Sequence, residues 1–139
     1  MPGPSLTRVG VSISRIYLER AKVFSESAIM FLRSYRQPII DRWFELSQAN
    51  LKPDFVSAEW FSAEMLGRMY DQILDAVGNR HYRELNRSIE TLTRAHSTPS
   101  PLDVKALLDL FGLSAREEHE LREETVRDSR QIREDLGTI

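Results

Sequence analysis

Three histidines, His81, His96 and His119, carry the most specific chemistry in this sequence. His96 follows Leu92 by a helical step of four, so we expect its ring at the edge of a core. A buried imidazole could ligate a metal or haem, but no second histidine shares this helix. A phosphotransfer role would need an exposed histidine in mid-helix, whereas Pro99 ends the helix three residues later. The simplest interpretation is a structural histidine bonded to a backbone carbonyl.

His119 lies in a charged run between Glu117 and Glu123. The pattern is His-Glu-x-x-Glu, which lacks the second imidazole of the zinc motif His-Glu-x-x-His. A paired-iron site would need two facing Glu-x-x-His motifs, and the sequence has none. We therefore expect this run to be a solvated helix face, and we expect His81 to be exposed beside a turn at Gly78.

The remaining residue types offer no recognisable catalytic set. The chain has no cysteine, which excludes disulfides, thiol catalysis and cysteine-based zinc sites. It has no Gly-x-Ser-x-Gly elbow, phosphate-binding glycine loop or dinucleotide fingerprint. Asp41 and Asp75 fit the polar faces of helices better than acid–base roles. We expect no catalytic residue, no metal site and no cofactor, and hence no enzyme.

An alternative is a helical protein or enzyme that binds a small ligand or cofactor. Its pocket would lie near His96, among the aromatic side chains of Trp43, Trp60 and Tyr70. A visible absorbance band or a bound metal in the purified protein would favour this alternative.

One patterned surface remains, a row of arginines that we call the arginine ridge, composed of Arg80, Arg83, Arg87 and Arg94. At ~100° per residue they fall within a sector of about 60°, and at 1.5 Å per residue they extend over roughly 21 Å. They lie opposite an apolar stripe that runs from Tyr82 to Leu92. An acidic protein partner would fit this ridge, and a plain solvated face is the alternative.

Composition limits the other classes of partner. The 139 residues fit one domain, and with 41% hydrophobic and 29% charged residues they suit a folded chain. Nucleic acid is an unfavourable partner because the net charge is −2 and no aromatic residues interleave the arginine ridge. No apolar run is long enough to span a bilayer, and residues 1–10 lack the apolar stretch of a signal peptide. We expect a cytoplasmic protein that does not bind membranes.

Apolar residues recur at helical spacing through most of the chain, which predicts an all-α fold. We expect a compact bundle-like or globin-like domain of six to seven helices. The helices are expected after Ser5, across residues 28–35, from Pro38 to Asn50, from Ser57 to Val77, across residues 82–92, across residues 104–111, and from Ser114 onward.

The last helix is expected to differ from the others. Gly112 predicts the end of the preceding helix, and Ser114 with Glu117 predicts a new capping box. The segment that follows is mostly charged and has few apolar residues at workable spacing. We expect a helical core domain at residues 1–113 and a charged terminal helix at residues 114–139, which packs shallowly or projects as a linker.

Two stretches resemble a known family, the RsbR/RsbRD-type stressosome co-antagonists. The segment from Phe31 to Trp43, in which Arg33-Ser34-Tyr35-Arg36 leads into Ile40-x-x-Trp43, resembles the opening helices of that family's N-terminal sensor domain. The segment from Thr93 to Ser100, followed by Val104 and Leu107, is similar to its junction before the last core helix. The resemblance covers about residues 28–112, and the related helical domain of RsbU-type phosphatases is a comparable likeness.

The resemblance implies a non-haem sensor domain from bacteria that forms a homodimer and passes a signal through its last helix. It implies no catalytic residue. Together with the arginine ridge, it predicts a sensory or protein-docking regulatory domain in bacterial stress signalling, acting through dimerisation or a partner switch.

Overall fold

The structure is a computed structural model that describes residues 23–95 and 101–139, without the side chains of residues 94, 95 and 101. Within these ranges it contains seven α-helices and no strand, which confirms the all-α prediction. The helix predicted after Ser5 lies outside the described residues. The helices are α2 (Glu26–Ser34), α3 (Arg36–Asn50), α4 (Pro53–Val56), α5 (Ala63–Asn79), α6 (Arg83–Ala95), α7 (Pro101–Leu121) and α8 (Ser129–Leu136).

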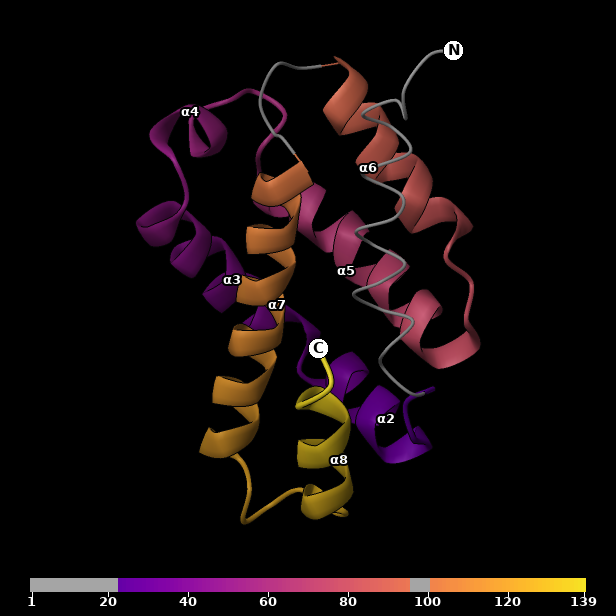
Figure 1. The fold of residues 1–139 in the computed structure, drawn as a ribbon. Helices are drawn as coiled ribbons and strands as arrows, with labels where there is room; N and C mark the ends of the chain where they lie inside the picture. Colours follow the sequence, from indigo (N-terminus) through magenta and orange to yellow (C-terminus); the bar gives the residue numbers. More distant parts are fainter. Residues whose placement is uncertain (1–22, 96–100) are drawn as a thin grey trace.

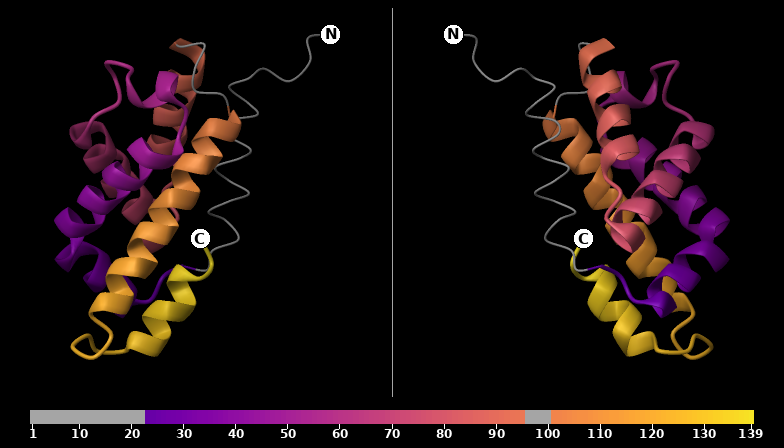
Figure 2. Two further views of the ribbon diagram at one scale, coloured as in Figure 1. Left: turned by 90° about the vertical axis from the view of Figure 1, so that its left-hand side faces the viewer. Right: turned by 90° about the vertical axis from the view of Figure 1, so that its right-hand side faces the viewer.

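Helix α3 is the central element of the arrangement. It packs against α7 on one side and against α5 on the other, and α6 covers the outer side of α5. Helices α2 and α8 pack together at one end of the molecule, where α8 also contacts α7 (Figure 1). In the left view of Figure 2, α7 runs diagonally alongside α3.

The core forms where the apolar faces of these helices meet. Helix α5 shows the pattern most clearly, because its inward positions recur every three or four residues. Leu66, Tyr70 and Ile73 have no exposed surface. Trp43 from α3 and Phe111 from α7 join them, with ring centroids 5.2 Å apart.

Some helix ends lie at or near the positions that the sequence predicts. Ser25 caps α2, its Oγ accepting the Ala28 N–H at 3.2 Å, and α3 ends at Asn50 as expected. The predicted start of α5 at Ser57 is wrong, because Ser62 is its N-cap and accepts the Met65 N–H at 3.1 Å. Ser57 instead ends the short helix α4, which begins at Pro53.

The predicted stop at Gly112 is also wrong, because α7 continues to Leu121. Gly112 is buried within this helix, where an added Cβ would lie 3.0 Å from Cγ2 of Ile139. Ser114 is not an N-cap, since its buried hydroxyl donates to the Leu110 carbonyl at 2.7 Å. Both residues allow close packing inside a helix.

The predicted charged helix at 114–139 is therefore two different segments. Its first part is the end of α7, so the expected boundary after residue 113 falls inside a helix. Its second part, α8, packs back onto α2 and α7 through Ile132 and Leu136, which are 1% and 0% exposed. The Asp135 carboxylate accepts the Ser25 N–H at 2.8 Å and ties α8 to the start of α2.

Among the described residues, no helix combines the length and the apolar character that crossing a membrane requires.

Candidate functional site

Three members of the arginine ridge lie on one exposed surface at the junction of α5 and α6. Arg83 and Arg87 project from α6, one helical turn apart, and are exposed. Arg94 belongs to the same helix, but its side chain lies outside the described residues. Arg80 differs from the prediction, because it precedes α6 rather than lying on it.

Arg80 ends α5 in a left-handed conformation, with φ of 57°. Its N–H donates to the Ala76 carbonyl at 2.9 Å and closes the last turn. Glycine or asparagine is usual at such a position, because a Cβ raises its energy by about 1–2 kcal/mol. The sequence has Gly78 and Asn79 just before it, yet the chain uses an arginine there.

The three arginines line one hollow of about 790 Å³, open to solvent. It extends over the turn between α5 and α6 and along the first two turns of α6, and its other lining residues are His81, Tyr82, Asn86 and Glu90. Asn86 was not predicted, although its spacing from Arg83 and Glu90 already places it on this side of the helix.

The hollow is electrostatically positive. Its lining contains three arginines and one glutamate, and the positive end of the α6 dipole lies at the same place. Oε1 of Glu84 lies 3.8 Å from Nη1 of Arg87 and offsets part of this charge. The side chains of Arg87 and Glu84 are nevertheless 67% and 59% exposed. An exposed pair of this kind is weak and leaves the guanidinium available to another anion.

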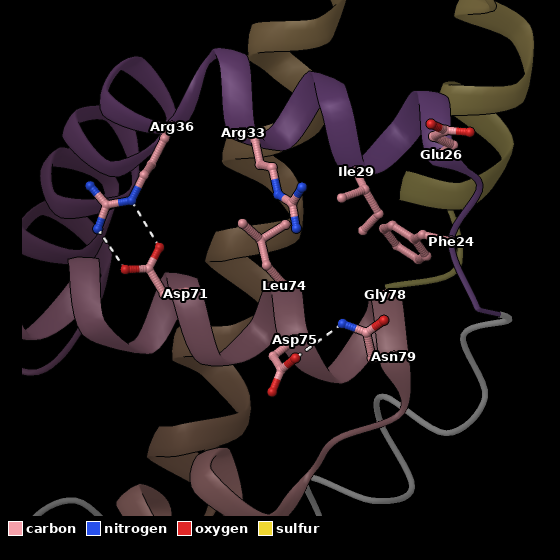
Figure 3. A pocket seen from close by; sticks show the side chains of 10 residues that line it. All are labelled: Phe24, Glu26, Ile29, Arg33, Arg36, Asp71, Leu74, Asp75, Gly78 and Asn79. Carbon is pink, nitrogen blue, oxygen red and sulfur yellow. Dashed lines mark hydrogen bonds and ion pairs between the residues drawn. The ribbon is translucent and has the colours of Figure 1, made fainter.

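A second hollow, the α2–α5 groove, lies on the other side of α5 (Figure 3). Its volume is about 540 Å³. Phe24, Ile29 and Leu74 supply its apolar part, and Figure 3 shows the Arg33 side chain extending from α2 toward Leu74.

The charges in this groove are largely balanced within the chain. Arg36 binds both carboxylate oxygens of Asp71 at 2.9 and 3.0 Å, and this hydrogen bonding raises the pKa of Arg36. Asp75 accepts from the Asn79 amide at 3.1 Å. Because its lining also includes Glu26, the groove has no excess of positive charge, and the arginine ridge is the stronger site for an anionic partner.

His81 connects the two hollows. Its Nδ1 lies 3.4 Å from Oδ1 of Asp75, a residue of the α2–α5 groove, while His81 itself lines the arginine hollow. Its side chain is 69% exposed, which confirms the sequence prediction.

His119 contradicts its prediction, because it is buried, with 2% of its surface exposed. Its ring packs edge-on against Phe31 at 5.2 Å, and Nε2 lies 3.0 Å from the Ser129 hydroxyl. Burial lowers the pKa of His119, the nearby Arg133 lowers it further, and Glu120 opposes them. Within the charged run, Glu118 and His119 are buried, whereas Glu120 is exposed as the sequence predicts.

Glu118 belongs to the same buried surface. Burial alone would raise its pKa, but hydrogen bonds from Arg122 and Arg42 lower it. Arg42 from α3 reaches Glu118 at 3.2 Å. This carboxylate joins α3 to α7 as an ion-paired structural group.

Two of the three aromatic side chains proposed to line a pocket near His96, those of Trp43 and Tyr70, are packed in the core. His96 lies outside the described residues. Trp43 is fully buried and donates its Nε1–H to the Leu107 carbonyl at 2.9 Å, and the Tyr70 hydroxyl donates to the Leu32 carbonyl at 2.5 Å. Both side chains bond to backbone groups of the core.

In the described ranges, no group of three or more His, Asp or Glu side chains is placed to hold a metal ion. No family model matches the chain, and no curated protein and no solved structure matches it. The resemblance to the stressosome co-antagonists therefore stays a prediction.

Proposed function

We propose that this chain is a non-catalytic regulatory domain that docks an acidic surface of a partner protein on the arginine ridge. The observation that carries the proposal is the convergence of Arg80, Arg83 and Arg87 on one solvent-open hollow. Guanidinium groups form paired hydrogen bonds with carboxylates, so three of them favour a partner with clustered Asp or Glu.

The conformation of Arg80 supports this assignment. A non-glycine residue in the left-handed region lowers stability, and such residues are enriched at functional positions. Gly at this position would suit the helix end better. An arginine there adds a third positive charge to the hollow at the expense of some stability.

The wider role in this proposal follows the resemblance. The domain acts in the cytoplasm of a bacterium, in stress-type signalling, as a homodimer that changes partner or state when a signal arrives. Electrostatic docking suits such switching because it speeds association more than it strengthens the final complex.

The binding experiment uses a fluorescent ten-residue peptide rich in Glu and Asp, and a matched peptide with Gln and Asn as the neutral probe. Fluorescence anisotropy at low and high salt reports the affinity. We expect the acidic peptide to bind and salt to weaken it, because solvent-exposed charges are screened. Charge reversal by Arg83→Glu with Arg87→Glu should weaken binding about ten-fold or more.

Two further variants separate charge from structure. Arg130→Glu changes an exposed arginine of α8, away from the ridge, and should bind as the unaltered protein does. Arg80→Gly should weaken binding while raising the free energy of unfolding by up to about 1 kcal/mol. Equal binding of the acidic and neutral peptides, or equal losses for Arg130→Glu and Arg83→Glu, would contradict the proposal.

A further inference from the structure

Helix α7 exposes a row of leucines that no other described element covers. Leu102, Leu113 and Leu121 are 73%, 39% and 69% exposed, and Leu110 is partly buried between them. At ~100° per residue these four lie within a sector of about 100°, on the side opposite the buried positions of α7. Those buried positions are Val104, Leu107, Leu108 and Phe111.

The spacing of these leucines is the same in both directions. Leu110 follows Leu102 by eight residues, Leu113 follows Leu110 by three, and Leu121 follows Leu113 by eight. Two antiparallel copies of α7, related by a two-fold axis between residues 111 and 112, would place Leu102 opposite Leu121 and Leu110 opposite Leu113 of the second copy. A two-fold interface requires this kind of self-complementary surface.

The charges beside the leucines have a similar symmetry, but its centre lies between residues 112 and 113, one residue from the centre of the leucines. Lys105, Asp109, Arg116 and Glu120 alternate in sign, at intervals of four, seven and four residues. In an antiparallel pair the same flank of each helix meets, so Lys105 approaches Glu120 and Asp109 approaches Arg116 of the second copy. In a parallel pair, opposite flanks of the two helices would meet, so these charges would have no charged partner of this set. Within one chain Lys105 and Asp109 already interact at 3.3 Å, but both side chains stay about half exposed.

From these observations we infer that the outward face of α7 is the interface between two antiparallel copies of this chain. The inference rests on the homodimer of the proposed function. It identifies the contact surface of that dimer and the antiparallel orientation of the two α7 helices. The contact along one helix of about 30 Å is small, so the dimer is expected to be reversible.

Sedimentation velocity at concentrations from about 1 μM to 1 mM tests the surface. The unaltered chain should shift from monomer to dimer across this range. Leu113→Glu should raise the dissociation constant at least ten-fold, because it places two carboxylates near the two-fold axis. Met30→Glu is the control, since Met30 is also an exposed apolar residue but lies on α2, and this variant should dimerise as the unaltered chain does. Circular dichroism checks that each variant is folded.

Disulfide trapping tests the direction, and the chain offers a clean background because it has no cysteine. Leu113→Cys should cross-link with itself, since the two positions are about 4.5 Å apart along the axis. Leu121→Cys should not cross-link with itself, because the two copies of residue 121 are separated by roughly 28 Å along the axis. It should cross-link with a second chain that carries Leu102→Cys.

The outcomes distinguish this inference from the proposal beneath it. A chain that stays monomeric throughout overturns both the homodimer and the α7 interface. A dimer that tolerates Leu113→Glu, or that cross-links through Leu121→Cys alone, overturns only the inference. Binding of the acidic peptide by the arginine ridge is measured separately and depends on neither result.

Discussion

At the scale of single residues, several buried side chains of this fold donate hydrogen bonds to backbone carbonyls. Tyr70 shows this most clearly, since its ring has no exposed surface and its hydroxyl donates to Leu32 of α2. Burial raises the pKa of Tyr70, so the hydroxyl keeps its proton and remains a donor. The bond fixes α5 against α2.

Tyr70→Phe should lower the free energy of unfolding by about 1–3 kcal/mol, because the Leu32 carbonyl loses its buried donor. Urea unfolding followed by circular dichroism measures the change. Tyr35→Phe is the control, since Tyr35 is only half-buried, and it should change stability less. Equal effects of the two changes would show that the Tyr70 hydroxyl contributes nothing specific.

The sequence predicts some of these residues correctly and misses others for a physical reason. The exposure of His81 follows from its neighbours in the chain, Gly78 and Asn79. The burial of His119 does not, because Phe31 and Ser129 cover it from other elements. A local charge pattern contains no information about which distant helix will pack over it.

At the scale of elements, amphipathic helices carry the fold. The apolar face of α5 was predicted from its spacing, and Leu66 and Ile73 have no exposed surface. Replacing either with alanine should cost about 2–5 kcal/mol by leaving a core cavity. Thermal melting of each variant checks this, with the exposed Arg68→Ala as a control that should change little. Unchanged melting of Leu66→Ala would mean that this face is assigned incorrectly.

The limits of the sequence are clearest in α7. Gly and Ser near residue 112 predict a helix end and a new cap, yet here they serve close packing. Gly112 leaves room for Ile139, and Ser114 bonds to Leu110 within the helix. The same residue types suit both purposes, and only the position of α8 decides between them. For the candidate site, the sequence identifies the arginines but not the separate conformation of Arg80.

At the scale of the whole molecule, stability should depend on pH through His119. Its folded pKa is lower than the ordinary value of 6.5, so the unfolded chain binds the proton first. Stability is therefore fully present above about pH 6.5 and decreases as the pH falls below it toward the folded pKa. His119→Gln removes the titrating group, so its stability should vary less over this window.

Urea unfolding at intervals between pH 7.5 and 5.5 measures this dependence. The window lies above the range where Glu118 contributes, because the pKa of Glu118 is lowered from 4.5 and its stabilisation is lost at lower pH. The exposed His81 serves as the control through His81→Gln. If His119→Gln keeps the full pH dependence of the unaltered chain, the buried imidazole is not its source.

The hydrogen bond from the Ser25 N–H to the Asp135 carboxylate bears on how the chain folds. It joins positions 110 residues apart, and closing so long a loop is entropically unfavourable until the intervening helices have collapsed. Helix α8 is also short, with eight residues, so it has little stability of its own. Its docking therefore belongs to the last stage of folding. By the same reasoning we expect local opening in the native state to begin at the α2–α8 end before it reaches the α3–α5–α7 core.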